Sequence, residues 1–184
     1  MKELEEEQEK SEKLLLNILP DDIAQRLKTG ETTIATKHGQ VSILFADIVN
    51  FTPQSALLNP NELVIILNEV FSIFDDLSTS YNIEKIKTIG DSYFAVGGLN
   101  GDSKKSAINL VLMAKEMVKR LHALNSTIDK MDLQLRIGIH CGDVVTGVIG
   151  KHKFAYDLWG AAVNFASRME STSEPGKIHI SENL

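Results

Sequence analysis

The sequence contains a single cysteine, Cys141, so an internal disulfide framework is excluded. Scarcity of disulfides is typical of proteins in a reducing compartment. No apolar run approaches the roughly 18 residues that a membrane-spanning helix needs. The N-terminus is acidic, whereas a signal peptide starts with basic residues followed by an apolar stretch. We therefore expect a soluble piece in the cytoplasm, although a longer parent protein can still be attached to a membrane.

Positive charge is also scarce, because 19 lysines and arginines stand against 25 acidic residues and leave a net charge of −6. Such a chain has no basic face for following a nucleic-acid backbone, and we expect no nucleic-acid partner. An anionic ligand must instead be held by local hydrogen-bond donors or by metal ions. With 43% hydrophobic residues in 184, the chain has the composition and length of one globular domain with a short extension.

The first 40 residues differ in pattern from the rest. Leucine and isoleucine recur at spacings of three and four between residues 15 and 27, which predicts an amphipathic helix interrupted near Pro20. This helix either packs on its own domain or forms a dimerising stalk that ties the domain to an upstream sensor. Residues 28–40 are polar, contain two glycines and are expected to form a connector. We divide the chain into a helical stalk with connector, 1–40, and a catalytic domain, 41–184.

From Val41 onward, apolar runs bounded by turn residues predict strands, and apolar residues with a helical period predict helices. The expected elements, in chain order, are strand 41–48, helix 59–81, strands 83–89 and 92–98 joined by a turn at Gly90 and Asp91, helix 102–125, a hairpin 133–150 that turns at Gly142 and Asp143, helix 162–172 and strand 176–181. Asn59, and Asp102 or Ser103, are expected as helix caps. This order predicts an α+β fold, with a ferredoxin-like β-α-β-β-α-β core and an appended hairpin, helix and strand.

Two aspartates, Asp47 and Asp91, are candidate ligands for a divalent cation. Asp47 ends an apolar strand, where an unpaired carboxylate is costly, and Asp91 lies at the tip of the next hairpin. Their strands are neighbours in the predicted topology, so both carboxylates are expected at one edge of the sheet. Hard cations such as Mg²⁺ commonly bind one or two carboxylates together with substrate phosphates. Taken alone, however, Asp91 also fits an ordinary turn residue.

Four segments make the interpretation specific. They are "FADIVNFT", "KIKTIGDSYFAVGGL", "RIGIHCGDVVTGVIG" and "YDLWGAAVNFASRME", and they occur in this order between residues 45 and 170. Together they resemble the successive signature blocks of the class III nucleotidyl cyclase catalytic domain, over about residues 41–180. Four ordered blocks are far more specific than any one of them.

The resemblance implies a metal and phosphate site at the first block. Asp47 and Asp91 are implied to bind two Mg²⁺ or Mn²⁺ ions per active site, with the carbonyl of Ile48 as a further ligand. The loop "IVNFT" is implied to hold the triphosphate through backbone N–H groups, which involves Asn50, Phe51 and Thr52. Family members commonly carry glycine where Asn50 stands, so we expect Asn50 to adopt a left-handed backbone conformation.

Asn164 and Arg168 fall at the family positions that bind the ribose and stabilise charge on the transferring phosphate. Their i, i+4 spacing places both on one face of a helix, as a shared ligand requires, although a solvated helix face fits the spacing too. In this family the metal aspartates and the Asn/Arg pair come from opposite subunits. Since this chain has both sets, the resemblance implies a homodimer with two shared active sites. No side chain is an obvious general base, so deprotonation of the ribose 3′-hydroxyl is assigned to the metals, assisted by Asp47.

Base choice depends on Lys87 and Asp157, which occupy the family's base-reading positions. Lysine donates to adenine N1 and aspartate accepts from N6, so the pair predicts ATP as substrate and cyclic AMP as product. Alone, each residue also fits an exposed strand lysine or a surface turn acid. Two alternatives stay open: a guanylate cyclase or a cyclase of relaxed specificity that makes cyclic GMP, and a nucleotide-binding regulatory dimer without turnover.

The sequence departs from the family pattern at its C-terminus. Family domains usually continue past this last strand into a helix and hairpin with a lysine for the terminal phosphates, whereas this sequence stops at Leu184. We expect a lower affinity for ATP and lower activity than in a domain with these residues. Ala161, at a position that is often polar in the family, is a second departure with no clear consequence.

Overall fold

The computed structural model describes residues 2–56, 58–126, 128, 131–150 and 153–184, which are organised around a six-stranded sheet. Five strands follow the order β2-β3-β1-β4-β5, and β6 pairs with β4 off this path. Their bounds are β1 Ile34–Ile48, β2 Glu84–Ile89, β3 Ser92–Gly97, β4 Leu135–Ile149, β5 Ala155–Trp159 and β6 Ile178–Ile180. The pairs along this path are antiparallel, whereas β6 is parallel to β4.

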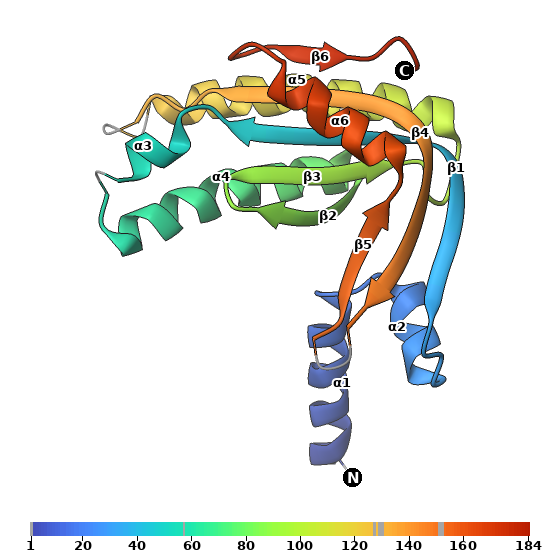
Figure 1. Ribbon diagram of the computed structural model, residues 1–184. Helices are drawn as coiled ribbons and strands as arrows, with labels where there is room; N and C mark the ends of the chain where they lie inside the picture. The colour runs from blue at the N-terminus through green and yellow to red at the C-terminus, as the bar shows by residue number, and fades with distance from the viewer. Residues whose placement is uncertain (1, 57, 127, 129–130, 151–152) are drawn as a thin grey trace.

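Helices cover the sheet on both faces (Figure 1). They are α4 Pro60–Ser80 and α5 Ser103–Asn125 on one face and α6 Ala161–Ser171 on the other. Asn59 caps α4 in a capping box with Glu62, and Asp102 caps α5 by accepting from the backbone of Lys104 and Lys105. The order β1-α4-β2-β3-α5-β4, followed by β5, α6 and β6, confirms the predicted fold class.

Side chains of β1 alternate between two hydrophobic cores. Leu44, Ala46 and Ile48 pack in the core under α4 and α5. Ile43 and Phe45 pack on the opposite side, together with Ala162 and Ala166 of α6. By the same alternation, Asp47 belongs to the α6 face, so its carboxylate follows two buried apolar side chains on that face.

Two predicted connections are wrong. The segment from Ile34 to Gln40 was expected in a connector but belongs to β1, and β4 continues without a turn through Gly142 and Asp143, where a hairpin turn was expected. The hairpin instead joins β4 to β5, beyond Ile149. The polar composition of the segment that begins at Ile34 concealed its strand character.

Pairing explains both errors. The first part of β1 is paired with the second part of β4, from Ile34 opposite Val148 to His38 opposite Val144, which gives both segments backbone partners. The register shifts between His38 and Val41, and Gln40 there has a φ of 52°. The backbone N–H of Gln40 donates to Asp143 at 3.1 Å. Gly142 and Asp143 therefore lie opposite a bulge and not in a turn.

We call the paired ends of β1 and β4 beyond this bulge, together with β5, the arm; it comprises residues 34–40, 142–149 and 155–159. Figure 1 shows the arm bending away from the sheet, with α1 (Lys2–Leu16) and α2 (Asp21–Lys28) at its far end. The break at Pro20 is confirmed. Ile23 and Ala24 of α2 are buried against Leu19 and Ile34, so α2 packs on its own domain. Dimerisation through α1 stays a prediction. Within the described residues, no helix is both long and apolar enough to cross a membrane.

Candidate active site

Asp47 and Asp91 lie at the same end of the sheet. In the pairing of β1 with β3, Asp47 is opposite Ser92, and Asp91 is the residue before Ser92 in the β2–β3 turn. Gly90 gives this turn its positive φ of 62°. Burial raises the pKa of Asp47, and the negative charge of Asp91 adds to the effect. The structure thus brings together the two carboxylates that the sequence places at one edge.

Arg136 and Glu170 complete this end of the sheet, and the sequence analysis missed both. Arg136 is opposite Asp47 in the pairing of β4 with β1 and donates to its carboxylate at 2.9 Å. The Arg136 Nε lies 3.2 Å from Glu170 Oε1 without hydrogen-bond geometry, so this contact is an ion pair alone. Burial raises the pKa of Glu170, the Asp47 charge adds to this rise, and Arg136 opposes it. The positive charge of Arg136 therefore stabilises the negative charges of two partly buried carboxylates, those of Asp47 and Glu170.

A signal for Arg136 was present in the sequence. It stands in "LQLRIGIH", an apolar strand, where a charge is as costly as the charge of Asp47. Two opposite charges in neighbouring buried strands indicate a cross-strand pair. Glu170 had no comparable signal, because a glutamate near the end of a helix is ordinarily exposed.

The donor set at this site is two carboxylates, from Asp47 and Asp91. Among the described residues, no three His, Cys, Asp or Glu side chains form a metal-binding group. This set is too small for a metal cage made by protein alone. It fits Mg²⁺ or Mn²⁺ delivered with a nucleotide, because such ions bind one or two carboxylates and complete their coordination with phosphate oxygens and water. A cation here also offsets the repulsion between the two carboxylates.

The expected phosphate loop is the turn from β1 into α3 (Phe51–Ser55). Asn50 precedes this short helix with φ 54° and ψ 27°, which confirms the predicted left-handed conformation. The Phe51 side chain is buried in the core under α4 and α5, whereas Asn50 and Thr52 are exposed. Phe51 can therefore meet a ligand only through its backbone, which agrees with the role that the resemblance implies.

The backbone of Asn50 leads to a stability prediction. Asn50→Gly should retain turnover and stability, since glycine adopts this conformation without steric cost, whereas Asn50→Val should lower the free energy of unfolding by about 1–2 kcal/mol. Urea denaturation measures the difference. Asn61→Val is a matched control, because Asn61 is exposed in the first turn of α4. Equal stabilities of the valine and glycine variants at position 50 would show that the strain is absent.

Asn164 and Arg168 lie on the outer side of α6. Ala162, Ala166 and Glu170 are buried, and they mark the side of the helix that faces the sheet. Asn164 and Arg168 are each two residues from the nearest of these buried residues. Two residues correspond to a rotation of about 200° around the helix axis. Both are exposed, and together with Ala161 and Phe165 they line a hollow of about 190 Å³. The predicted pair is therefore assembled on one face, pointing away from the sheet of its own chain.

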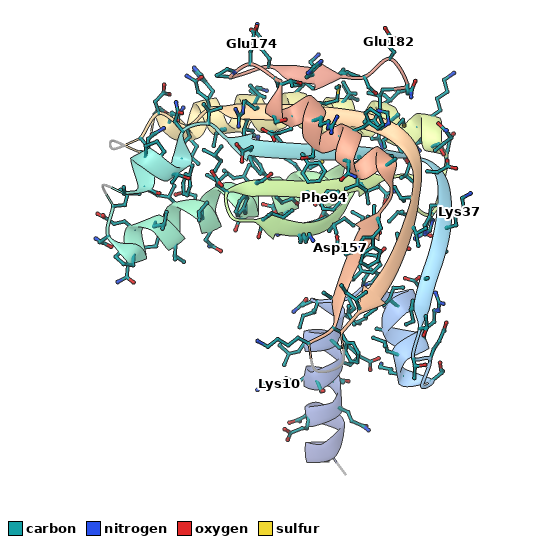
Figure 2. The ribbon with its side chains drawn as sticks, in the orientation of Figure 1. Lys10, Lys37, Phe94, Asp157, Glu174 and Glu182 are labelled. Atoms are coloured by element: carbon teal, nitrogen blue, oxygen red, sulfur yellow. The ribbon has the colours of Figure 1, made fainter. Side chains whose placement is uncertain are left out.

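Lys87 and Asp157 form an ion pair with Nζ and Oδ2 2.5 Å apart (Asp157 is labelled in Figure 2). The second carboxylate oxygen of Asp157 accepts from the backbone N–H of Leu158 at 2.9 Å, which fixes the plane of the carboxylate. The Lys87 side chain is 41% exposed, whereas that of Asp157 is 18% exposed. The structure thus joins the two residues to which the resemblance assigns base reading.

A larger cavity, of about 580 Å³, lies elsewhere in the molecule. Its walls are mostly apolar and come from α5, including Ile108 and Leu112, and from Leu184 at the end of the chain. None of the predicted site residues lines it, and no pair of opposite charges faces into it. Its size does not make it the active site, because substrate recognition requires polar groups that converge.

The comparisons with known proteins identify the family of this chain. Residues 33–184 match the family described as the adenylate and guanylate cyclase catalytic domain. An adenylate cyclase of Mycobacterium tuberculosis is 41% identical over 182 residues, which are 98% of this chain and 41% of the relative. The catalytic core of a rhodopsin-guanylyl cyclase with converted specificity, in complex with ATPαS, is 34% identical with a TM-score of 0.74, covering 81% of this chain and 80% of that chain. A guanylyl cyclase domain from the aquatic fungus Blastocladiella emersonii, described as a non-canonical dimer, is 33% identical with a TM-score of 0.73, covering 80% of this chain and 82% of that chain.

The chain therefore belongs to the family of adenylate and guanylate cyclase catalytic domains. Both adenylate and guanylate cyclases are among its relatives, so membership defines the reaction class and leaves the base open. The chain spans less than half of the length of the curated relatives that it matches, 41% in the mycobacterial protein.

Proposed function

We propose that this chain is an adenylate cyclase catalytic domain, which converts ATP to 3′,5′-cyclic AMP and pyrophosphate. The observation that carries this proposal is the Lys87–Asp157 pair, with one donor and one acceptor side by side. Adenine offers the complementary pattern, an N1 acceptor beside an N6 donor. Guanine places a protonated N1 against the ammonium, which leaves donors opposed at a cost of about 1–3 kcal/mol for each unmet group.

The other residues act on the ribose and phosphates. Asp47, Asp91 and the carbonyl of Ile48 would hold up to two Mg²⁺ or Mn²⁺ ions, and such ions would supply positive charge toward the ribose 3′-hydroxyl and the phosphates. The backbone of residues 50–52 holds the triphosphate. Asn164 orients the ribose, and Arg168 stabilises the charge that develops on the α-phosphorus during attack by the 3′-oxygen.

We propose that the active site is shared between two chains of a homodimer. The support is the direction of α6, whose Asn164 and Arg168 point away from the sheet that holds Asp47 and Asp91 of the same chain. A second chain can present these side chains across a symmetric interface, which creates two equivalent sites. In this arrangement, α1 and an upstream sensor in the parent protein would act by changing the orientation of the two subunits.

The proposal is tested by incubating the purified chain with ATP or GTP and Mn²⁺ and measuring cyclic nucleotide and pyrophosphate. We expect cyclic AMP and pyrophosphate in equal amounts, with a kcat/KM for ATP at least about 10-fold above that for GTP, because one unmet group already costs this much. Cyclic GMP alone would establish the guanylate cyclase alternative. Binding of ATP without either product would establish the regulatory dimer.

A further inference from the structure

The base-reading pair joins two strands that are not neighbours in the sheet. Lys87 lies on β2 and Asp157 on β5, and these strands stand at opposite ends of the order β2-β3-β1-β4-β5. Lys87 thus belongs to the main sheet and Asp157 to the arm, and the two strands meet because the arm bends back toward β2 (Figure 1). The distance between the two side chains therefore depends on the angle between the arm and the main sheet.

His38 connects the arm to the rest of the domain. It lies on β1 within the arm, and both nitrogens of its ring have a partner. Nδ1 is 3.1 Å from the carbonyl oxygen of Leu99, which follows β3 and is outside the arm. Nε2 is 3.0 Å from the hydroxyl oxygen of Thr146, which is on β4 within the arm. One side chain thereby holds together segments that are 61 and 108 positions away from it in the sequence.

The two partners determine which nitrogen of the ring carries the proton. A carbonyl oxygen can only accept, so Nδ1 donates to Leu99, and in the neutral ring Nε2 is then an acceptor. The Thr146 hydroxyl can donate to Nε2, because its other acceptor, the carbonyl oxygen of Thr36, is farther away at 3.5 Å. Thr146 is only 2% exposed, so water cannot readily replace a lost partner. Both ends of the ring are therefore paired, and each hydrogen bond is costly to lose.

Both partners of this histidine lie close to the base-reading pair. In the pairing of β4 with β5, Asp157 is opposite the residue that follows Thr146. Leu99 packs in the hydrophobic core under α6 together with Phe94, and Phe94 is opposite Lys87 in the pairing of β3 with β2. The histidine thus ties the strand segment beside Asp157 to the segment beside Lys87.

We propose that His38 is a positioning residue, which fixes the angle of the arm and thereby the distance between Lys87 and Asp157. This inference rests on the proposed role of these two residues in base reading. His38 is near the beginning of β1, whereas Asp47 and Asp91 lie at the end of this strand, so the effect of His38 falls on recognition of the base. Loss of its hydrogen bonds should weaken ATP binding and base discrimination while the chemical step is retained.

The experiment measures equilibrium binding of 3′-deoxy-ATP and 3′-deoxy-GTP with Mn²⁺, because both lack the attacking hydroxyl and cannot be cyclised. Thr146→Val removes the hydroxyl at similar volume and should raise the Kd for 3′-deoxy-ATP about three- to tenfold, as expected for one lost hydrogen bond. The change for 3′-deoxy-GTP should be smaller, because guanine does not match the pair that is disturbed. Thr146→Ser keeps the hydroxyl and should bind as the wild type. With ATP as substrate, KM of Thr146→Val should rise and kcat stay within about twofold of the wild type.

A double variant distinguishes a connected pair from two separate effects. His38→Phe keeps an aromatic ring, removes both hydrogen bonds and should weaken 3′-deoxy-ATP binding at least as much as Thr146→Val. Adding Thr146→Val to His38→Phe should cause no further loss, since the hydroxyl then has no bond to His38. His122→Phe and Thr33→Val, both at exposed positions, are the matched controls and should bind as the wild type. Thermal melting and sedimentation check that each variant is folded and dimeric, and the Thr146 variants suffice if His38→Phe does not fold.

The outcomes separate this inference from the proposed function. Unchanged Kd values in Thr146→Val, equal losses for both nucleotides, or strictly additive losses in the double variant would overturn the positioning role even if the wild type makes cyclic AMP. A wild-type chain that binds 3′-deoxy-ATP but makes no cyclic nucleotide would refute turnover and still allow the binding comparison. A wild-type chain that binds neither nucleotide would refute both.

Discussion

An equal mixture of Asp47→Ala and Arg168→Ala chains should recover about a quarter of the wild-type activity, although each variant alone should be reduced by about 10²-fold or more. Random pairing puts half of the dimers in the mixed form. Each mixed dimer has one site with both substitutions and one site with neither. Half of the dimers therefore have one intact site out of two, which is a quarter of all sites. The rate of cyclic AMP formation after mixing, relative to the wild type, measures this fraction of intact sites.

The reason for expecting recovery is the geometry of α6. Its buried series, Ala162, Ala166 and Glu170, faces the sheet, and Glu170 reaches the Arg136 that pairs with Asp47. Arg168 lies on the far side of the same helix. A rotation of α6 that turned Arg168 toward Asp47 of its own chain would expose the two alanines and break the Glu170 contact. If Asp47, Asp91 and Arg168 act on one substrate, as we propose, they must therefore meet across two chains.

The control for this experiment is a mixture of Asp47→Ala with Asp91→Ala chains. Both substitutions lie at the same end of the sheet, so every site in every dimer lacks one carboxylate and no activity should return. Recovery in this control, or none in the Asp47→Ala and Arg168→Ala mixture, would contradict a shared site. Sedimentation of both mixtures checks that dimers form and exchange.

Local patterns predicted the elements that determine the site. The cap at Asn59, the Gly90 turn and the helix of Asn164 each depend on a few neighbouring residues, and all three are present. The left-handed conformation of Asn50 was predicted differently, from the glycine that family members carry at this position and from the tolerance of asparagine for this conformation. Such features can be predicted because their physical causes lie within a few residues of chain.

Long-range pairing was beyond these patterns. The turn expected at Gly142 and Asp143 was a reasonable local inference, but these residues lie opposite a bulge because the segment from Ile34 to His38 extends β1. The salt bridge of Asp47 with Arg136 joins residues 89 positions apart and depends on strand register. The contact between β2 and β5 depends on how the arm bends, and no short segment encodes that.

Exchanging both base-reading residues should reverse the substrate preference. In Lys87→Glu with Asp157→Cys, the glutamate can accept from guanine N1–H and N2, and the ammonium that opposed them is gone. Adenine loses the hydrogen-bond partners of two or more of its groups. The ratio of kcat/KM for ATP to kcat/KM for GTP should therefore fall by about 10²- to 10⁴-fold. Initial rates of cyclic AMP and cyclic GMP formation measure this ratio, and Lys115→Glu, an exposed position on α5, is the control for charge reversal.

The single variants should behave worse than the double variant, because the two side chains form an ion pair in this structure. Lys87→Glu alone places a second carboxylate against Asp157, whose side chain is only 18% exposed, so like charges meet where water cannot screen them well. We expect this variant to use both nucleotides poorly, and the further change Asp157→Cys to restore activity with GTP. A Lys87→Glu chain that is as active with GTP as the double variant would show that the two residues read the base independently. A double variant that still prefers ATP would mean that base choice lies outside the Lys87–Asp157 pair.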